Sequence, residues 1–490
     1  IIRLAGKSCG GSILDYRRSI GTHFTHNLQN PMIDFNNISQ NNWADTRISI
    51  LGAGKSGIAA GVLGAHVGAN IFISESDNSP DIIKNIGDFK HEVGGHSNTV
   101  LDADFLVKSP GIPNDIPIIK ECENQKIPIV SEIEFASWFT SSPILALTGS
   151  NGKTTTVNLL HEMCISDGRT SLLGGNIGMP FSENVLWELT SNITNPIHVL
   201  ELSSFQLEHI NTFSPAIAGI LNISADHLDR YADINAYAAE KMKLANQIND
   251  SGWLVFNADD PILAESLLNT NRSVVFSLTQ NENCLFKLNA TKVYTGETDN
   301  PDILFKFEDT KLKGFHNLQN ILAAATMAHS FGISREAIQN TIINFTPIPH
   351  RLEWVGSIHN VDYFNDSKAT NIAAATAAIE SFDDNLILIL GGQDKGSTDF
   401  TQLIPCMENR VHSIIAYGAA GKEIKNQLDE SFMVTYCEYF EDAMLTANDN
   451  SKPGDTVLLS PACASFDQFS SYEQRGNTFV EIFNKLELEN

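Results

Sequence analysis

The chain has no run of apolar residues long enough to span a bilayer, which argues against a membrane-spanning role. Its 7 cysteines are scattered and include no C-x-x-C pair, so we expect neither a zinc site nor a disulfide framework. The N-terminal stretch lacks the basic-then-apolar pattern of a signal peptide. Together these absences predict a soluble protein with free thiols in a reducing cytoplasm.

Positive charge is also scarce. The sequence has 32 Lys and Arg against 58 Asp and Glu, a formal net charge of -26. Binding to nucleic acid or to an anionic membrane needs a basic face, so we exclude both as general partners. We interpret the acidity as a solvated, repulsive surface. A phosphate ligand is compatible with it, because a few cations and backbone N–H groups suffice for a local anion site.

The length of 490 residues predicts about three domains, and the pattern of apolar runs predicts their class. Strand-like runs alternate with helical stretches in three successive series, which indicates an α/β fold with parallel sheets covered by helices. We place the boundaries at 47–131, 132–347 and 348–490. Residues 1–46 are expected to form a poorly ordered tail, with Met32 as the natural start.

The first series opens on a glycine turn, Gly52-Ala53-Gly54-Lys55-Ser56-Gly57, between a strand and a helix. This order matches the G-x-G-x-x-G fingerprint, and Glu75 stands at the end of the next strand, where a ribose-binding acid would lie. The turn predicts either an NAD-dependent oxidoreductase or a smaller nucleotide phosphate held at the helix N-terminus. It decides neither, since such turns also serve helix–strand packing.

The second series contains TGSNGKTT, Thr148 to Thr155, between an apolar run and a helix-like run. This order aims backbone N–H groups and the positive helix end at an anion. Lys153 would reach the outer phosphates, and the Thr154 hydroxyl is placed to ligate Mg²⁺. The loop is short, because Leu147 stands where the general pattern has a glycine. A nucleoside triphosphate is the predicted ligand, and a plain glycine-rich turn is the alternative.

Acidic and histidine side chains follow the next strands of the same series. Glu201 closes IHVLE and would lie beside the phosphate loop if the two strands are neighbours. A buried acid there is costly unless it pairs with a cation. Asp226 and His227 follow the next strand, in ISADHLDRY. A lone histidine is usually structural, but flanking acids favour a role for His227 in the catalytic site.

The third series carries three polar loops, NDSKAT (365–370), GGQDKG (391–396) and SPACAS (460–465), each after a strand. Ligands of open α/β sheets bind outside the carboxyl ends of the strands. Each loop alone is explained by a helix cap or a turn. Together they favour a site that faces the central domain.

These residues, in this order, resemble the Mur ligase family. The supporting stretches are SPGI, TGSNGKTT, GGNIG, VLELSSFQLE, DHLDRY, HNLQN, PHRLE, NDSKATN and LLSPACASFDQF. They run from about Arg47 to the end, and VLELSSFQLE and SPACASFDQF look like the members that add D-glutamate. The resemblance implies an N-terminal Rossmann-like UDP-binding domain, a central P-loop-type ATPase domain and a C-terminal Rossmann-like domain.

The resemblance also implies a reaction. The terminal carboxylate of UDP-N-acetylmuramoyl-L-alanine would attack the γ-phosphate of ATP, and the amine of D-glutamate would then attack the acyl phosphate. Such an enzyme works by positioning and by neutralising charge. We further expect a monomer in the bacterial cytoplasm. The rivals are a relative that adds another amino acid, a folate polyglutamylating enzyme, or a nucleotide-dependent switch, although no N-K-x-D stretch supports the last.

The family resemblance assigns roles to three groups of residues: one for catalysis, metal and ATP, one for the UDP substrate and one for D-glutamate. The catalytic and metal set, with two Mg²⁺ and a carbamylated Lys241, would be Lys153, Thr154, Glu201, His227, Lys241 and Lys368. ATP would also be held by Gly149, Ser150, Asn151, Gly152, Thr155, Asn317, Asn320, Arg351 and Asp366. Without the resemblance, Lys241 would be interpreted as an exposed lysine on an amphipathic helix.

The other two groups bind the remaining substrates. The UDP-substrate residues would be Gly54, Lys55, Ser56, Glu75, Ser76, Ser109, Pro110, Gly111 and Asn176. The D-glutamate residues would be Thr370, Lys395, Ser460 and Phe466. The chain departs from better-known relatives at Glu75-Ser76-Asp77, where they have an acid–Thr–Arg run, and in the GGQDKG loop by one residue.

Overall fold

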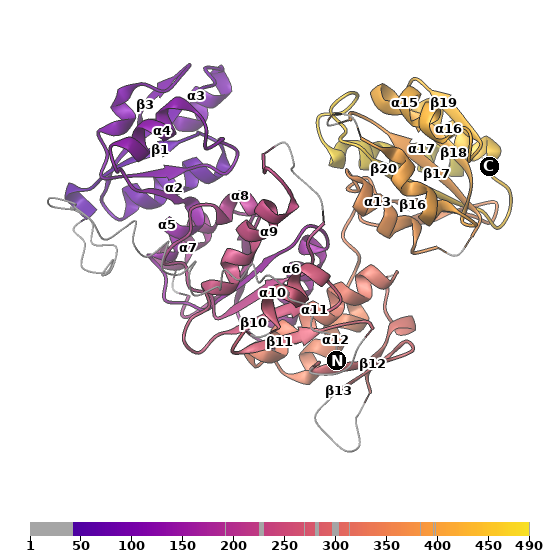
Figure 1. Cartoon of the computed structure of the whole chain (residues 1–490), viewed down its shortest axis with the longest axis horizontal. Coiled ribbons are helices and arrows are strands. Elements are labelled where there is room, and N and C mark those ends of the chain that lie inside the picture. The colour runs from indigo at the N-terminus through magenta and orange to yellow at the C-terminus, as the bar shows by residue number, and fades with distance from the viewer. Residues whose placement is uncertain are drawn as a thin grey trace, which may run out of the picture.

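We analysed a computed structural model of the chain, which describes residues 43–489 except 192, 225–229, 269, 280–283, 296–302, 313, 383, 395 and 397. Four sheets make up its β structure (Figure 1). Three are mainly parallel and covered by helices, as the alternating pattern predicts, so the α/β fold class is confirmed. Among the described residues, no helix combines the length and apolar character needed to cross a membrane.

The first sheet has five parallel strands in the order β3-β2-β1-β4-β5. Its strands are β1 (Arg47–Leu51), β2 (Asn70–Glu75), β3 (Lys90–Val93), β4 (Phe105–Lys108) and β5 (Ile129–Ser131). The accompanying helices are α2 (Lys55–His66), α3 (Pro80–Ile86), α4 (Pro117–Asn124) and α5 (Glu132–Ser137). A Cβ on Gly57 would lie 1.9 Å from the Gly52 carbonyl oxygen, so the glycine turn brings α2 directly onto β1.

The central sheet has six parallel strands in the order β11-β10-β9-β6-β8-β7. The strands are β6 (Ile144–Thr148), β7 (Ser171–Gly175), β8 (Ile197–Glu201), β9 (Ile217–Ile220), β10 (Trp253–Asn257) and β11 (Ser273–Phe276). The helices are α6 (Lys153–Ser166), α7 (Phe181–Thr190), α8 (Ser204–Leu207), α9 (Ile234–Met242), α10 (Pro261–Leu267), α11 (Phe315–Phe331) and α12 (Arg335–Asn344). Every residue of β6 and β8 is buried, as continuous apolar runs in a covered parallel sheet require.

A small antiparallel sheet and the last large sheet complete the fold. The small one contains β12 (Phe286–Asn289), β13 (Lys292–Thr295) and β14 (Ile303–Lys306). The last has the order β15-β16-β20-β17-β18-β19. Its strands are β15 (Glu353–Ile358), β16 (Val361–Asn365), β17 (Leu386–Gly391), β18 (Val411–Tyr417), β19 (Val434–Cys437) and β20 (Thr456–Ala462). Its helices are α13 (Ile372–Ile379), α14 (Ile404–Met407), α15 (Gly418–Leu428), α16 (Phe440–Asn450) and α17 (Tyr472–Glu489).

The hydrophobic cores show how these sheets are joined. One continuous buried cluster runs from the first sheet, through Ile50 and Phe105, into one face of the central sheet at Ala146 and Leu200. The last sheet has its own two buried clusters, one on each face. In Figure 1 it stands apart from the first sheet, and both flank the central one. The carboxyl ends of central strands and the loop after β16 of the last sheet line a common cleft.

Candidate active site

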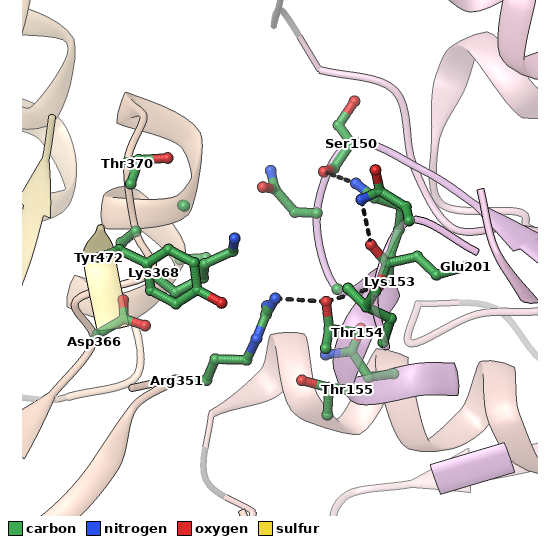
Figure 2. Close-up of a pocket in the computed structure, with 18 of the residues that line it drawn as sticks. Ser150, Lys153, Thr154, Thr155, Glu201, Arg351, Asp366, Lys368, Thr370 and Tyr472 are labelled. Carbon is green, nitrogen blue, oxygen red and sulfur yellow. Dashed lines mark hydrogen bonds between the residues drawn. The ribbon is translucent and has the colours of Figure 1, made fainter. Parts of the chain in front are cut away.

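A cleft of about 730 Å³ lies at the carboxyl ends of the central strands. Its walls combine the phosphate loop and the start of α11 with residues 351–352 and 366–371, α13 and the start of α17. Lys55 and Ser56 of the first glycine turn also line it. Figure 2 shows Ser150, Lys153, Thr154 and Glu201 on one side and Asp366, Lys368, Thr370 and Tyr472 on the other, with Arg351 reaching across. Segments far apart in sequence therefore share one cavity.

The phosphate loop has the conformation that its glycines predict. Gly149 has φ 157°, and Gly152, which precedes α6, has φ 82°, in the left-handed region. The amide oxygen of Asn222 accepts hydrogen bonds from the backbone N–H groups of Ser150 (3.1 Å) and Asn151 (2.8 Å). Lys153 Nζ lies inside the loop, 2.9 Å from the Gly149 carbonyl oxygen. Loop and lysine thus form a compact cationic pocket at a helix N-terminus.

Glu201 lies beside this loop, as expected if β6 and β8 are neighbours. The two strands pair in parallel with Leu147 opposite Glu201. The Thr154 hydroxyl donates to Glu201 Oε2 at 2.7 Å, and the Asn176 amide donates to Oε1 at 2.8 Å. Arg351 Nη2 in turn donates to the Thr154 hydroxyl oxygen at 2.6 Å. A hydroxyl and a carboxylate are oxygen donors of the kind that Mg²⁺ prefers, so these residues fit that ion.

Lys241 is buried, with 1% of its surface exposed, so the interpretation as an exposed helix lysine is wrong. Its Nζ donates to the Gly149 carbonyl oxygen at 2.8 Å and lies 4.7 Å from the ring centre of Tyr237. A buried amine is therefore held against the phosphate loop. Asp226, His227 and Lys395 lie outside the described residues, and their roles stay predictions.

The opposite wall carries Asp366 and Lys368, both in the loop after β16. Burial raises the pKa of Asp366 to about 7, although hydrogen bonds from the Ser460 hydroxyl and the Leu352 N–H act to lower it. Burial, followed by the neighbouring charge of Arg351, lowers the pKa of Lys368 to about 8, and Glu201 opposes that shift. Lys368 Nζ lies 3.8 Å from the ring centre of Tyr472. The wall therefore presents one acid and one amine whose charges respond to their surroundings.

The remaining ATP and UDP-substrate candidates divide between the cleft and its margin. The cleft is lined by Asn151, Gly152, Thr155, Asn176, Asn317 and Asn320, with Lys55 and Ser56 from the first turn. Outside its lining lie Gly149, Gly54, Glu75, Ser76, Ser109, Pro110 and Gly111. The Glu75 carboxylate faces its own turn and accepts from the Ala53 N–H at 2.7 Å. Burial raises the pKa of Glu75, but hydrogen bonds from Ala53 and Asp77 outweigh it and lower the pKa overall.

Among the D-glutamate candidates, Thr370 lines the cleft, whereas Ser460 and Phe466 do not. Ser460 is fully buried and donates to Asp366 Oδ2 at 3.0 Å. Phe466 is 68% exposed. Their role stays a prediction. The sequence analysis missed Asn371, Tyr472 and Glu473, which do line the cleft. The only signal for the last two was their place shortly after SPACAS, at the start of α17.

A phosphate loop coupled to an acid, with cations facing it from loops of the last sheet, is the arrangement of a nucleotide-dependent enzyme. The Mur ligase middle domain matches residues 147–328, and the Mur ligase glutamate ligase domain matches residues 350–463. The chain is 37% identical, over 90% of its length and 98% of the relative's, to the UDP-N-acetylmuramoylalanine--D-glutamate ligase of Chloroherpeton thalassium. The corresponding ligase of Salinibacter ruber is 38% identical over 90% of this chain and 98% of its own. The chain belongs to the Mur ligase family.

Solved structures support the fold. The MurF ligase of Thermotoga maritima in complex with ADP matches with a TM-score of 0.59 at 17% identity, covering 92% of this chain and 97% of that one. A pseudomurein peptide ligase type C from Methanothermus fervidus matches with a TM-score of 0.57 at 18% identity, covering 90% and 100%. At these identities the likeness concerns the fold alone. Membership of the family leaves the oxidoreductase alternative without support.

Proposed function

We propose that the chain ligates D-glutamate to UDP-N-acetylmuramoyl-L-alanine at the expense of ATP, and that ADP and phosphate are the other products. The observation that carries the proposal is the Arg351–Thr154–Glu201 chain of contacts, which joins the phosphate loop to the wall that holds Lys368. The choice of substrates is supported by relatives that are named for this ligation and match nearly their whole length.

Three domains would each contribute one part of the reaction, with boundaries at 47–131, 132–347 and 348–490. We assign the first, Rossmann-like, to the UDP moiety, the central one to ATP, and the last to D-glutamate and the reacting phosphate. Because the last sheet has separate hydrophobic clusters, it is the unit expected to move when ATP binds. A monomeric state and a location in the bacterial cytoplasm are part of the proposal.

ATP would place its β- and γ-phosphates in the phosphate loop, where Lys153 leaves its carbonyl partners to contact them. Thr154 and Glu201 would hold a Mg²⁺ ion, which supplies charge neutralisation for the phosphate oxygens. Asn317 and Asn320 line the same part of the cleft and would contact the rest of the nucleotide. A second Mg²⁺, held by His227 and a carbamylated Lys241, is part of the proposal. Its support is that Lys241 is buried at the loop.

The terminal carboxylate of the UDP substrate would attack the γ-phosphorus, which forms the acyl phosphate and releases ADP. Arg351 and Lys368 would neutralise the three transferring oxygens. The amine of D-glutamate would then attack the acyl carbon, and inorganic phosphate would leave after loss of a proton from the amine. Thr370, with Lys395, would hold the carboxylates of D-glutamate. Exclusion of water by the facing walls would protect the acyl phosphate from hydrolysis.

The decisive experiment measures phosphate release from ATP, with Mg²⁺ and UDP-N-acetylmuramoyl-L-alanine, while candidate amino acids are added singly. We expect release to require D-glutamate and to fall by at least about a hundredfold in Lys153→Ala. Lys120→Ala, at an exposed position on α4, is the matched control and should retain activity. Release that requires a different amino acid would overturn the substrate assignment while leaving the mechanism. Release with none of them would overturn the proposal.

A further inference from the structure

Arg475, on the first turn of α17, has none of its surface exposed. Its described hydrogen bonds go to hydroxyl and carbonyl oxygens. Nε donates to the Ser367 hydroxyl at 2.9 Å, and Nη2 donates to the Ser367 carbonyl at 2.7 Å. Nη1 donates to the Tyr417 hydroxyl and to the Cys463 carbonyl, both at 3.2 Å. The guanidinium therefore uses all three of its nitrogens.

Burial of this cation demands an explanation. An isolated buried charge is expensive, and a well-packed apolar side chain of similar volume often serves stability equally well. The planar guanidinium offers something that an apolar residue lacks, namely five N–H donors in a fixed geometry. The acceptors here are hydroxyl and main-chain carbonyl oxygens on three separate segments. These hydrogen bonds are therefore better explained by a role in fixing the positions of loops than by stability alone.

The segments joined by Arg475 follow neighbouring strands of the last sheet. Ser367 follows β16, Cys463 follows β20, and Tyr417 ends β18. The loop after β17 also packs against Arg475, because a Cβ on Gly392 would lie 3.0 Å from Arg475 Nη1. One side chain thus contacts the carboxyl ends of four strands that the sheet order places side by side.

The two hydrogen bonds from Arg475 to Ser367 lead directly to the cleft. Ser367 immediately precedes Lys368, and its hydroxyl also donates to the Tyr472 carbonyl oxygen at 2.8 Å. Tyr472 is the residue whose ring lies under the Lys368 ammonium. Arg475 itself is not part of the cleft lining. It therefore acts on the reacting groups through Ser367, without touching them.

We propose that Arg475 is a positioning residue: by holding the loops after β16, β18 and β20 in register, it aligns Lys368 and Thr370 with the phosphate loop across the cleft. This inference rests on the proposed function. Loss of the guanidinium hydrogen bonds should displace Lys368 and Thr370 while leaving the phosphate loop intact. The expected signature is a rise in the KM for D-glutamate together with a fall in kcat, with little change in the KM for ATP.

The test uses the full-length chain and compares Arg475→Lys with Ser367→Ala. Lysine keeps the charge but cannot donate hydrogen bonds from three nitrogens. We therefore expect kcat to fall by about a hundredfold, because small displacements of the reacting groups are costly. The KM for D-glutamate should rise at least about tenfold, and the KM for ATP should change less than about twofold. Ser367→Ala should shift the same constants in the same direction, more weakly.

The matched control is Arg410→Lys. Arg410 also donates to main-chain carbonyls, at 3.0 Å to Phe382 and 3.1 Å to Cys406, but it lies just before β18 and outside the cleft lining. A purely structural role for Arg475 would lower the melting temperature and the active fraction while leaving every KM unchanged, and that result would overturn the inference. Equal shifts in the KM for ATP and for D-glutamate would do the same. An inactive wild-type chain would instead contradict the proposed function.

Guanidinium rescue separates loss of the group from loss of the fold. In Arg475→Ala, added guanidinium chloride should restore part of the lost kcat, whereas sodium chloride at the same ionic strength should not. Rescue by both salts, or by neither in a variant that circular dichroism shows to be folded, would count against a positioning guanidinium.

Discussion

Lys368 is a cleft residue whose charge depends on its surroundings. Its ammonium lies among Arg351, Glu201, Glu473 and Lys153, against the face of Tyr472. Burial and the two like charges favour the neutral amine, and the two acids oppose them without cancelling them. If Lys368 neutralises the transferring phosphate, only its protonated form does so.

The charge of Lys368 predicts an alkaline limit. With a pKa of about 8, the ammonium is present below that pH and is lost as pH rises through it. We therefore expect kcat/KM for the UDP substrate to fall by about tenfold per pH unit above the pKa. Lys368→Arg should move this limb upward by more than about one unit, because a guanidinium stays charged.

Rates of phosphate release from about pH 6 to about pH 10 would measure this limb. Circular dichroism at each pH controls for unfolding. A limb at the same pH in wild type and in Lys368→Arg would assign the titration to another group.

At the scale of the element, the phosphate loop depends on a backbone conformation that few residues adopt. Gly152 has φ 82°, and a Cβ there would lie 2.1 Å from the Asn320 amide oxygen. The left-handed conformation alone costs about 1–2 kcal/mol for a residue with a Cβ. The close approach of α11 adds a steric conflict at the ATP end of the cleft.

Gly152→Ala should therefore displace Asn320 and raise the KM for ATP by at least about tenfold, in addition to lowering stability. Gly168→Ala is a close control, because Gly168 also has positive φ, 75°, but a Cβ there meets no atom within 4 Å. It lies beyond the other end of α6 and should lower the melting temperature without changing the KM for ATP. Similar effects of the two variants on the KM for ATP would contradict the steric argument.

At the scale of the whole molecule, the first sheet is attached to the central one both by a shared core and by a buried cluster of charges. Glu208 Oε2 accepts from Arg230 at 2.7 Å and lies 3.4 Å from Lys108 Nζ. Arg230 Nη2 also donates to the Ile112 carbonyl oxygen, in the loop after β4, at 3.1 Å. The cluster therefore links Arg230, which lies between β9 and α9, to the loop that contains Ser109 and Pro110.

Glu208→Gln should lower the free energy of unfolding by about 3–5 kcal/mol, because it leaves two buried cations without their carboxylate. Burial raises the pKa of Glu208, but the hydrogen bond from Arg230 and the charge of Lys108 outweigh it, so the pKa is lowered overall. Its stabilising contribution is thus present above the ordinary pKa of 4.5 and is lost as pH falls through the lowered value.

Denaturant melts at neutral and acidic pH would measure this contribution. Glu123→Gln, at an exposed position on α4, should change stability by less than about 0.5 kcal/mol and serves as the control. The difference between wild type and Glu208→Gln should shrink in acid. A difference that is independent of pH would exclude the charge as its cause.

The parts of the site that are local in sequence were predictable. A strand, a glycine turn and a helix lie within about a dozen residues, so the placement of Lys153 and Thr154 follows from backbone chemistry alone. The pairing of Glu201 with Thr154 required one further assumption, that β6 and β8 are neighbours, and the structure confirms it. The α/β class followed in the same way from alternating apolar runs.

Other features depend on contacts between distant segments, and no local pattern encodes them. Ser460 lies in β20 and Phe466 in the loop after it, yet the first is buried beside Asp366 and the second is exposed to solvent. Burial of Lys241 against the loop depends on where α9 packs, and burial of Arg475 depends on the ends of four strands meeting α17. Residue chemistry and short-range geometry set the ligand class. Long-range packing selects which side chains reach the ligand, because it alone determines which strand ends converge.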